Sequence, residues 1–161
     1  MAAVPEAQVP VLLDLWQIRG QDLDPMLEEE VRTWRQELDW DFQPSADLVR
    51  RFVDVHALNG YALLVGDEVV GYSYYVCEDH KGLVGDLYLR AKNRTADNEH
   101  RLLGAVIEHL VRTPYVRRIE SQLMLARYLQ PRLLPSAAFA RSFERNFMAV
   151  DASVATSLPP R

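Results

Sequence analysis

The spacing of apolar residues predicts four helices. The first begins at Asp24, because an N-cap acid followed by a proline is typical of a helix start, and it runs into one apolar face. That face holds Leu27, Val31, Trp34 and Leu38. The second helix is capped by Ser45 and carries one apolar stripe. That stripe holds Leu48, Phe52 and Val55. The third spans about 96–111, and a short fourth helix spans 135–147.

Runs of β-branched and aromatic residues predict about six strands. They lie at 9–18, 61–65, 68–77, 83–90, 117–126 and 148–155. The Gly66-Asp67 turn between the second and third strands is a hairpin signal, and the fourth strand returns beside them as an antiparallel meander. Gly85 lies inside that fourth strand, where a glycine indicates a bulge or a close backbone approach.

This order of elements predicts an α/β (α+β) domain with a mixed central sheet flanked by helices. We expect one domain over residues 1–155 and a linker-like tail over 156–161. The start of the chain lacks the basic and apolar stretches of a signal peptide, and no apolar run has the length of a membrane span. Cys77 is the only cysteine, so an intrachain disulfide is excluded. We therefore expect a cytoplasmic protein that binds no membrane.

Charge is distributed unevenly along the chain. The net charge of −5 argues against nucleic-acid binding. Residues 112–161, however, carry +5 with eight arginines and no lysine, so the preceding residues carry −10. This basic segment is either a solvated surface or a docking face for an acidic partner or anionic ligand.

Residues 86–94 read DLYLRAKNR, the end of a strand running into the start of the third helix. This stretch and the order of elements resemble the GNAT superfamily of N-acetyltransferases, over about residues 10–155. The resemblance implies that the fourth strand separates from the fifth and that acetyl-CoA lies in the gap. Its pantetheine arm would pair with backbone near Leu87 and Leu89, and Arg94 and Asn98 would lie at the pyrophosphate turn.

The turn departs from the family motif at both glycine positions, which Asp97 and Glu99 occupy. A side chain there blocks the close backbone approach that glycine allows, and a carboxylate repels a diphosphate. Acids in the first helical turn also stabilise a helix by themselves. The tyrosine that protonates the leaving thiolate in many family members corresponds to Phe143, which cannot donate a proton.

Glu78 and Asp86 are the candidates for the general base that the resemblance calls for, because a carboxylate can deprotonate an amine through water. The four histidines have no partner at metal-ligand spacing, so no metal site is predicted.

The sequence thus leaves two functions open. The chain is either an N-acetyltransferase that uses acetyl-CoA, or a non-catalytic GNAT-like lobe that shapes or supports an active GNAT domain. We expect its partner to be a second GNAT-like domain or another copy of the chain.

Overall fold

The computed structural model describes residues 9–146 and 148, which build a five-stranded sheet in sequence order. The strands are β1 (Val11–Asp14), β2 (Asn59–Val65), β3 (Glu68–Glu78), β4 (Lys81–Leu89) and β5 (Arg118–Ser121). Each consecutive pair is antiparallel except β4 and β5, which are parallel. The sheet is therefore mixed, and the meander expected from the sequence is confirmed.

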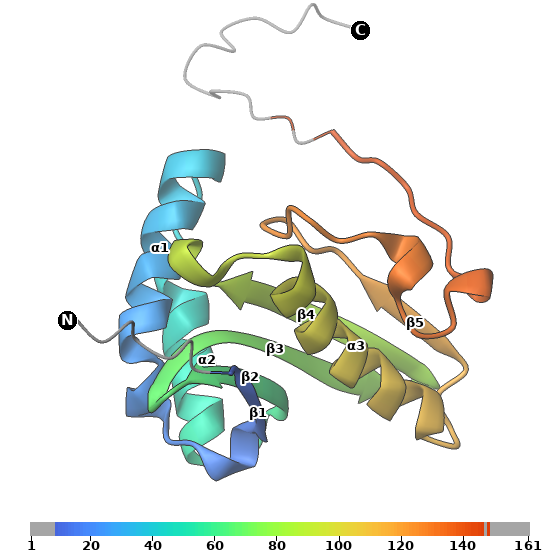
Figure 1. Ribbon diagram of the computed structural model, residues 1–161, viewed down its shortest axis with the longest axis horizontal. Coiled ribbons are helices and arrows are strands. Elements are labelled where there is room, and N and C mark those ends of the chain that lie inside the picture. The colour runs from blue at the N-terminus through green and yellow to red at the C-terminus, as the bar shows by residue number, and fades with distance from the viewer. Residues whose placement is uncertain (1–8, 147, 149–161) are drawn as a thin grey trace, which may run out of the picture.

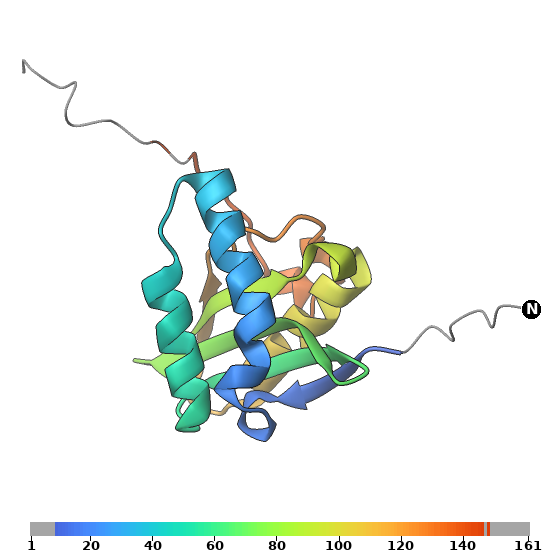
Figure 2. The ribbon, with the colours of Figure 1, turned by 90° about the vertical axis from the view of Figure 1, so that its left-hand side faces the viewer.

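Three α-helices cover the two faces of the sheet (Figure 1). They are α1 (Asp24–Leu38), α2 (Gln43–Asp54) and α3 (Ala96–Arg112). Figure 2 shows α1 and α2 side by side on one face, with α3 behind the sheet. Two apolar cores result, one between the sheet and α1 with α2, the other between the sheet and α3. None of these helices has both the length and the apolar character needed to cross a bilayer.

The α/β class and the helices α1 and α3 agree with the sequence prediction, but α2 differs in its orientation. It begins at Gln43, before the predicted cap Ser45. Its buried side holds Ala46, Val49 and Val53, whereas the predicted stripe of Leu48, Phe52 and Val55 faces solvent. Because α2 has apolar residues on both sides, periodicity selected the wrong face.

The region after α3 also differs from the prediction. The strand predicted over 117–126 is reduced to β5, and 122–146 contains no strand or α-helix. The 3₁₀ turn Ala137–Phe139 stands where a fourth helix was expected, and another, Pro131–Leu133, precedes it. The predicted last strand over 148–155 lies outside the described residues except Met148. The described sheet therefore has five strands rather than about six.

A bulge at Gly85 interrupts β4, as the sequence predicted. Tyr74 of β3 pairs with Asp86, but the next residue, Tyr75, pairs with Val84, so Gly85 is the additional residue. A Cβ atom on Gly85 would lie 2.1 Å from the Tyr74 ring. Glycine is thus required here because the tyrosine ring packs directly on the backbone.

We predict opposite effects on stability for two glycine substitutions. Gly85→Ala should lower the free energy of unfolding by about 1–3 kcal/mol, because the added methyl group displaces the Tyr74 ring. Gly104→Ala, inside α3, should raise it by about 0.5–1 kcal/mol, because its nearest neighbours lie 3.9 Å away and alanine favours the helix. Urea unfolding measures the change in the free energy of unfolding for both variants. Equal changes would contradict the close packing of the Tyr74 ring on Gly85.

Candidate functional site

The parallel pairing of β4 with β5 covers only the first half of β4. The paired residues run from Lys81 with Arg118 to Val84 with Ser121. Beyond the Gly85 bulge, Asp86 to Leu89 have no partner in β5. The two strands therefore diverge at the bulge and leave one edge of β4 open to another part of the chain.

The segment that follows β5, residues 122–134, lies at this open edge; we call it the crossing segment. Leu125 is 3% exposed and belongs to the core on the α1 and α2 face. Leu123 and Ala126 instead pack on the core of the α3 face. Adjacent residues of the crossing segment therefore pack toward opposite faces of the sheet, beyond the last pair of β4 with β5.

Two side chains of α3 hold the crossing segment by its backbone. The Glu99 carboxylate is 1% exposed and accepts hydrogen bonds from the Arg127 N–H at 2.9 Å and the Tyr128 N–H at 2.7 Å. His100 Nε2 accepts the Gln130 N–H at 2.9 Å, while Nδ1 donates to the Ala96 carbonyl at 2.6 Å. Glu99 therefore does not extend toward a ligand at the helix start, because its carboxylate is used inside the chain.

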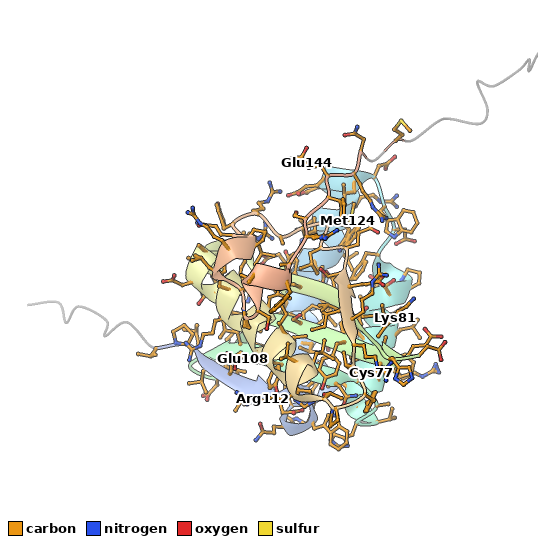
Figure 3. All side chains as sticks on the ribbon, turned by 90° about the vertical axis from the view of Figure 1, so that its right-hand side faces the viewer. Cys77, Lys81, Glu108, Arg112, Met124 and Glu144 are labelled. Atoms are coloured by element: carbon orange, nitrogen blue, oxygen red, sulfur yellow. The ribbon has the colours of Figure 1, made fainter. Side chains whose placement is uncertain are left out.

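The crossing segment is also tied to the opposite helix. The Arg127 guanidinium forms an ion pair with Glu37 in the last turn of α1. Figure 3 shows Met124 of the crossing segment and Glu144 toward one end of the molecule, away from Cys77 and Lys81 at the β3–β4 hairpin. The segment thus bridges α3 and α1 across the end of β4.

The predicted pantetheine-binding residues Leu87 and Leu89 have their backbone groups occupied within the chain. The Leu87 N–H donates to Asp86 Oδ1 at 2.7 Å. The Leu89 carbonyl accepts from Arg94 Nη2 at 3.0 Å and Nε at 3.3 Å. The Arg94 guanidinium also lies over the Tyr88 ring, 5.3 Å from its centroid. Arg94 therefore folds back on β4 instead of reaching into the turn.

The turn before α3 is closed by its own side chains. The Asn98 N–H donates to Thr95 Oγ1 at 3.2 Å, which is an N-cap, and Asn98 Nδ2 donates to the Asn93 carbonyl at 2.8 Å. Asp97 is exposed in the first turn, where an acid stabilises the helix. These contacts stabilise the helix start and present no glycine backbone to an anion.

Asp86 belongs to a buried carboxyl pair with Glu30 of α1. Glu30 is 0% and Asp86 5% exposed, and each carboxyl group affects the pKa of the other. Glu30 Oε1 accepts the Trp34 Nε1–H at 3.3 Å, and Glu30 Oε2 has no hydrogen-bond partner among the described residues. Burial, followed by the charge of Asp86, raises the pKa of Glu30 well above its ordinary value. Burial also raises the pKa of Asp86, whereas Glu30 and the hydrogen bond from the Leu87 N–H lower it. Of the two carboxyl groups, Glu30 is therefore the one whose protonated form is favoured more strongly.

The end of β4 is joined to α1 by Glu29. One carboxylate oxygen accepts the Ala91 N–H at 2.7 Å, and the other accepts Arg90 Nε at 3.0 Å. The Tyr88 hydroxyl donates to the first oxygen at 3.3 Å. Glu29 thus fixes the position at which the chain leaves the sheet.

The second base candidate, Glu78, lies elsewhere. It is exposed at the end of β3 and pairs in register with Lys81 at the hairpin. Asp86 is paired with Tyr74, four residues earlier in β3. The structure does not bring the two predicted carboxylates together.

Structures of similar fold are acetyltransferases. One is a possible acetyltransferase from Clostridium difficile 630, with 10% identity, a TM-score of 0.56, and coverage of 89% of this chain and 98% of that chain. Another is the ribosomal-protein-alanine N-acetyltransferase from Brucella melitensis, with 13% identity, a TM-score of 0.56, and coverage of 91% and 99%. A third is an aminoglycoside N-acetyltransferase in complex with CoA, with 10% identity, a TM-score of 0.56, and coverage of 91% and 98%.

The chain has the fold of the GNAT acetyltransferases. At these identities the likeness establishes the fold alone. No protein-family model matches the sequence, and no curated protein matches it.

Sequence reasoning about this GNAT-like site missed the roles of Glu30 and Glu99. Glu99 was interpreted as a first-turn acid that stabilises its helix, and Glu30 was given no role in the site. Glu30 lies at helical spacing between the apolar residues Leu27 and Trp34, and Glu99 lies at the same spacing before Leu103. An acid on the apolar stripe of a helix is the signal that could have indicated a buried, hydrogen-bonded carboxyl group.

Removing the Glu99 charge should loosen the crossing segment of the GNAT-like fold. Glu99→Gln places an NH₂ group against a backbone N–H, so we expect the free energy of unfolding to fall by about 1.5–3 kcal/mol. The matched control, Asp97→Asn, removes a first-turn charge that touches no part of the crossing segment, and should cost less than about 1 kcal/mol. Hydrogen exchange at the Arg127 and Tyr128 amides should accelerate only in Glu99→Gln. Equal exchange in both variants would contradict the anchoring role.

The Glu30–Asp86 pair predicts a specific pH dependence. Above the ordinary glutamate pKa of 4.5, the folded chain keeps a proton on Glu30 that the unfolded chain releases. The free energy of unfolding contributed by Glu30 therefore falls as pH rises from that value toward the raised pKa. Glu30→Gln keeps a side chain of nearly the same size and removes the titrating proton. The free energy of unfolding of Glu30→Gln, relative to that of the wild type, should therefore increase with pH. The increase is about 1.4 kcal/mol for each pH unit between the ordinary pKa of Glu30 and its raised pKa.

Urea unfolding from about pH 5 to about pH 8 measures this increase. The control is Glu28→Gln, an exposed acid on the same helix, whose difference from the wild type should stay nearly constant over this range. A constant difference for Glu30→Gln as well would show that Glu30 does not retain its proton.

Proposed function

We propose that this chain is a non-catalytic GNAT-like domain that serves as a structural or substrate-shaping partner of an active GNAT domain. One observation carries the proposal: the crossing segment, which follows β5 where the pairing with β4 ends, is held in place by the buried Leu125 and by the Glu99 carboxylate. The GNAT resemblance assigns the space between these strands to acyl-CoA. Removing Leu125 from the core would cost on the order of 2–5 kcal/mol, so the crossing segment does not leave its position easily.

The residues around the gap do not fit acetyl-CoA. The Leu87 N–H and the Leu89 carbonyl, which would pair with the pantetheine arm, are bonded to Asp86 and Arg94. An acyl-CoA arm would have to break these contacts and displace the crossing segment. We therefore derive no acetyl-transfer step for the closed chain.

The acid–base groups also support a domain without chemistry of its own. Asp86 is buried, its carboxylate already accepts the Leu87 N–H, and it is coupled to the buried Glu30. A general base must reach the amine or a bridging water, and this carboxylate is committed to internal bonds. Phe143, in place of the proton-donating tyrosine, is 80% exposed.

Acetyl transfer to an amine is the alternative function. It is favoured by the acetyltransferases of similar fold and by the divergence of β4 from β5, which this chain retains. In that case the crossing segment would have to leave its position before acetyl-CoA could enter. The cytoplasmic location predicted from the sequence remains a prediction.

Calorimetric titration with acetyl-CoA tests the proposal. We predict no binding to the wild type, and measurable binding to the double variant Asp97→Gly, Glu99→Gly, which supplies both glycines and releases the crossing segment. The control is Asp97→Gly alone, which leaves Glu99 in place and should stay without binding. Circular dichroism establishes that each variant is folded.

Micromolar binding to the wild type would refute the proposal and support acetyl transfer. Equal binding to the single and double variants would show that the turn, and not the crossing segment, is what prevents binding.

The basic segment 112–161 remains the proposed contact for a second GNAT-like domain. Three of its arginines are already paired with glutamates of this chain: Arg112 with Glu108, Arg118 with Glu120, and Arg127 with Glu37. Two of these glutamates, Glu108 and Glu37, lie outside the segment, so part of its +5 charge is offset by the rest of the chain.

A further inference from the structure

The outward face of α2 is apolar where a surface helix ordinarily carries polar residues. Leu48, Phe52 and Val55 are 48%, 42% and 62% exposed. They follow each other at i, i+4 and i+7, which places them along one side of the helix over about 10 Å. The opposite side of α2 packs in the core, so this face is a second apolar surface and has no role in the fold.

Apolar residues extend this surface at both ends of α2. At its C-terminal end, Trp16 is 55% exposed, and its ring centroid lies 6.2 Å from that of His56. At its N-terminal end, Pro44 is exposed. Contiguous exposed apolar residues of this kind mark interaction surfaces in soluble proteins.

One charge of each sign lies on the same flank of this surface. Asp47 and Arg51 are both exposed and stand one helical turn apart. Asp47 accepts a hydrogen bond from Gln43 Nε2 at 2.8 Å. Among the residues that the structure describes, Arg51 forms no salt bridge. This side of α2 therefore carries a negative group, Asp47, and one turn later toward the C-terminus a positive group, Arg51.

We propose that α2 packs against α2 of a second copy of this chain, antiparallel and related by a two-fold axis. With the axis between Leu48 and Phe52, Leu48 of one copy faces Phe52 of the other. Val55 and Trp16 of one copy then approach Pro44 of the other. A two-fold interface requires a patch that is complementary to itself, and this apolar order meets the requirement.

The charges identify the partner as a second copy. In the antiparallel arrangement the same flanks meet, so Asp47 of each copy lies about two residues, or about 3 Å along the axis, from Arg51 of the other. Both ion pairs form at once. A partner with a uniformly acidic or basic surface would match only one of the two residues and would be repelled by the other. This inference does not depend on whether the chain binds acetyl-CoA.

Sedimentation of the full chain across micromolar concentrations tests the dimer. We expect a monomer–dimer equilibrium for the wild type and a monomer for Phe52→Ser. The control, Val76→Ser, removes a similarly exposed apolar side chain from β3 and should leave the dimer unchanged. Circular dichroism separates loss of the dimer from loss of the fold.

Charge exchange tests the antiparallel register. Asp47→Arg and Arg51→Asp should each weaken the dimer about tenfold, because each replaces two attractive pairs with repulsive ones. The variant carrying both changes should restore the wild-type affinity.

Three results would overturn the proposal. They are a wild type that is monomeric at every concentration, a dimer insensitive to Phe52→Ser, and a double exchange that fails to restore the dimer. If the chain is a monomer, truncation after residue 148 tests whether its own C-terminal residues cover this face. Loss of hydrogen-exchange protection in α2 of the truncated chain would show that they do.

Discussion

The pairing of β4 with β5 ends at Val84, and the rest of the described structure is arranged around the gap that follows. Gly85 produces the bulge, and Asp86 to Leu89 then lack a neighbour in β5. Backbone groups at an open sheet edge must find other partners when they are buried. In this chain the Leu87 N–H and the Leu89 carbonyl find them internally, and the crossing segment is bonded to Glu99 of α3. The GNAT-like fold is therefore kept, with these backbone groups of β4 bonded inside the chain.

Carboxyl groups, together with apolar contacts, hold the chain around the end of β4. The buried Glu99 binds two backbone N–H groups, the partly exposed Glu29 holds the start of the turn after β4, and the buried Glu30 is coupled to Asp86. Removing one partner of such a bond leaves a buried polar group unsatisfied, which costs more than the bond itself contributes. The crossing segment is thus held in one position, consistent with a domain that shapes or supports others.

Much of the fold could be predicted from the sequence. The apolar residues of α1 and α3 recur at helical spacing, and the strands of the meander are separated by short turns, so each pattern indicates one kind of element. The orientation of α2 could not, because Val49 and Leu48 are adjacent apolar residues and only tertiary packing decides which is buried. The site was predicted at Asp86, Leu87 and Leu89 by resemblance. The contact of Glu99 with the crossing segment joins residues 28 and 29 positions apart, and no local pattern indicates it.

A crystal structure of the chain grown with excess acetyl-CoA tests the central claim most directly. We predict that the crossing segment keeps its position, with the Arg127 and Tyr128 N–H groups on the Glu99 carboxylate, and that no CoA lies beside Leu87. Electron density for acetyl-CoA along β4, with the crossing segment displaced from Glu99, would contradict it.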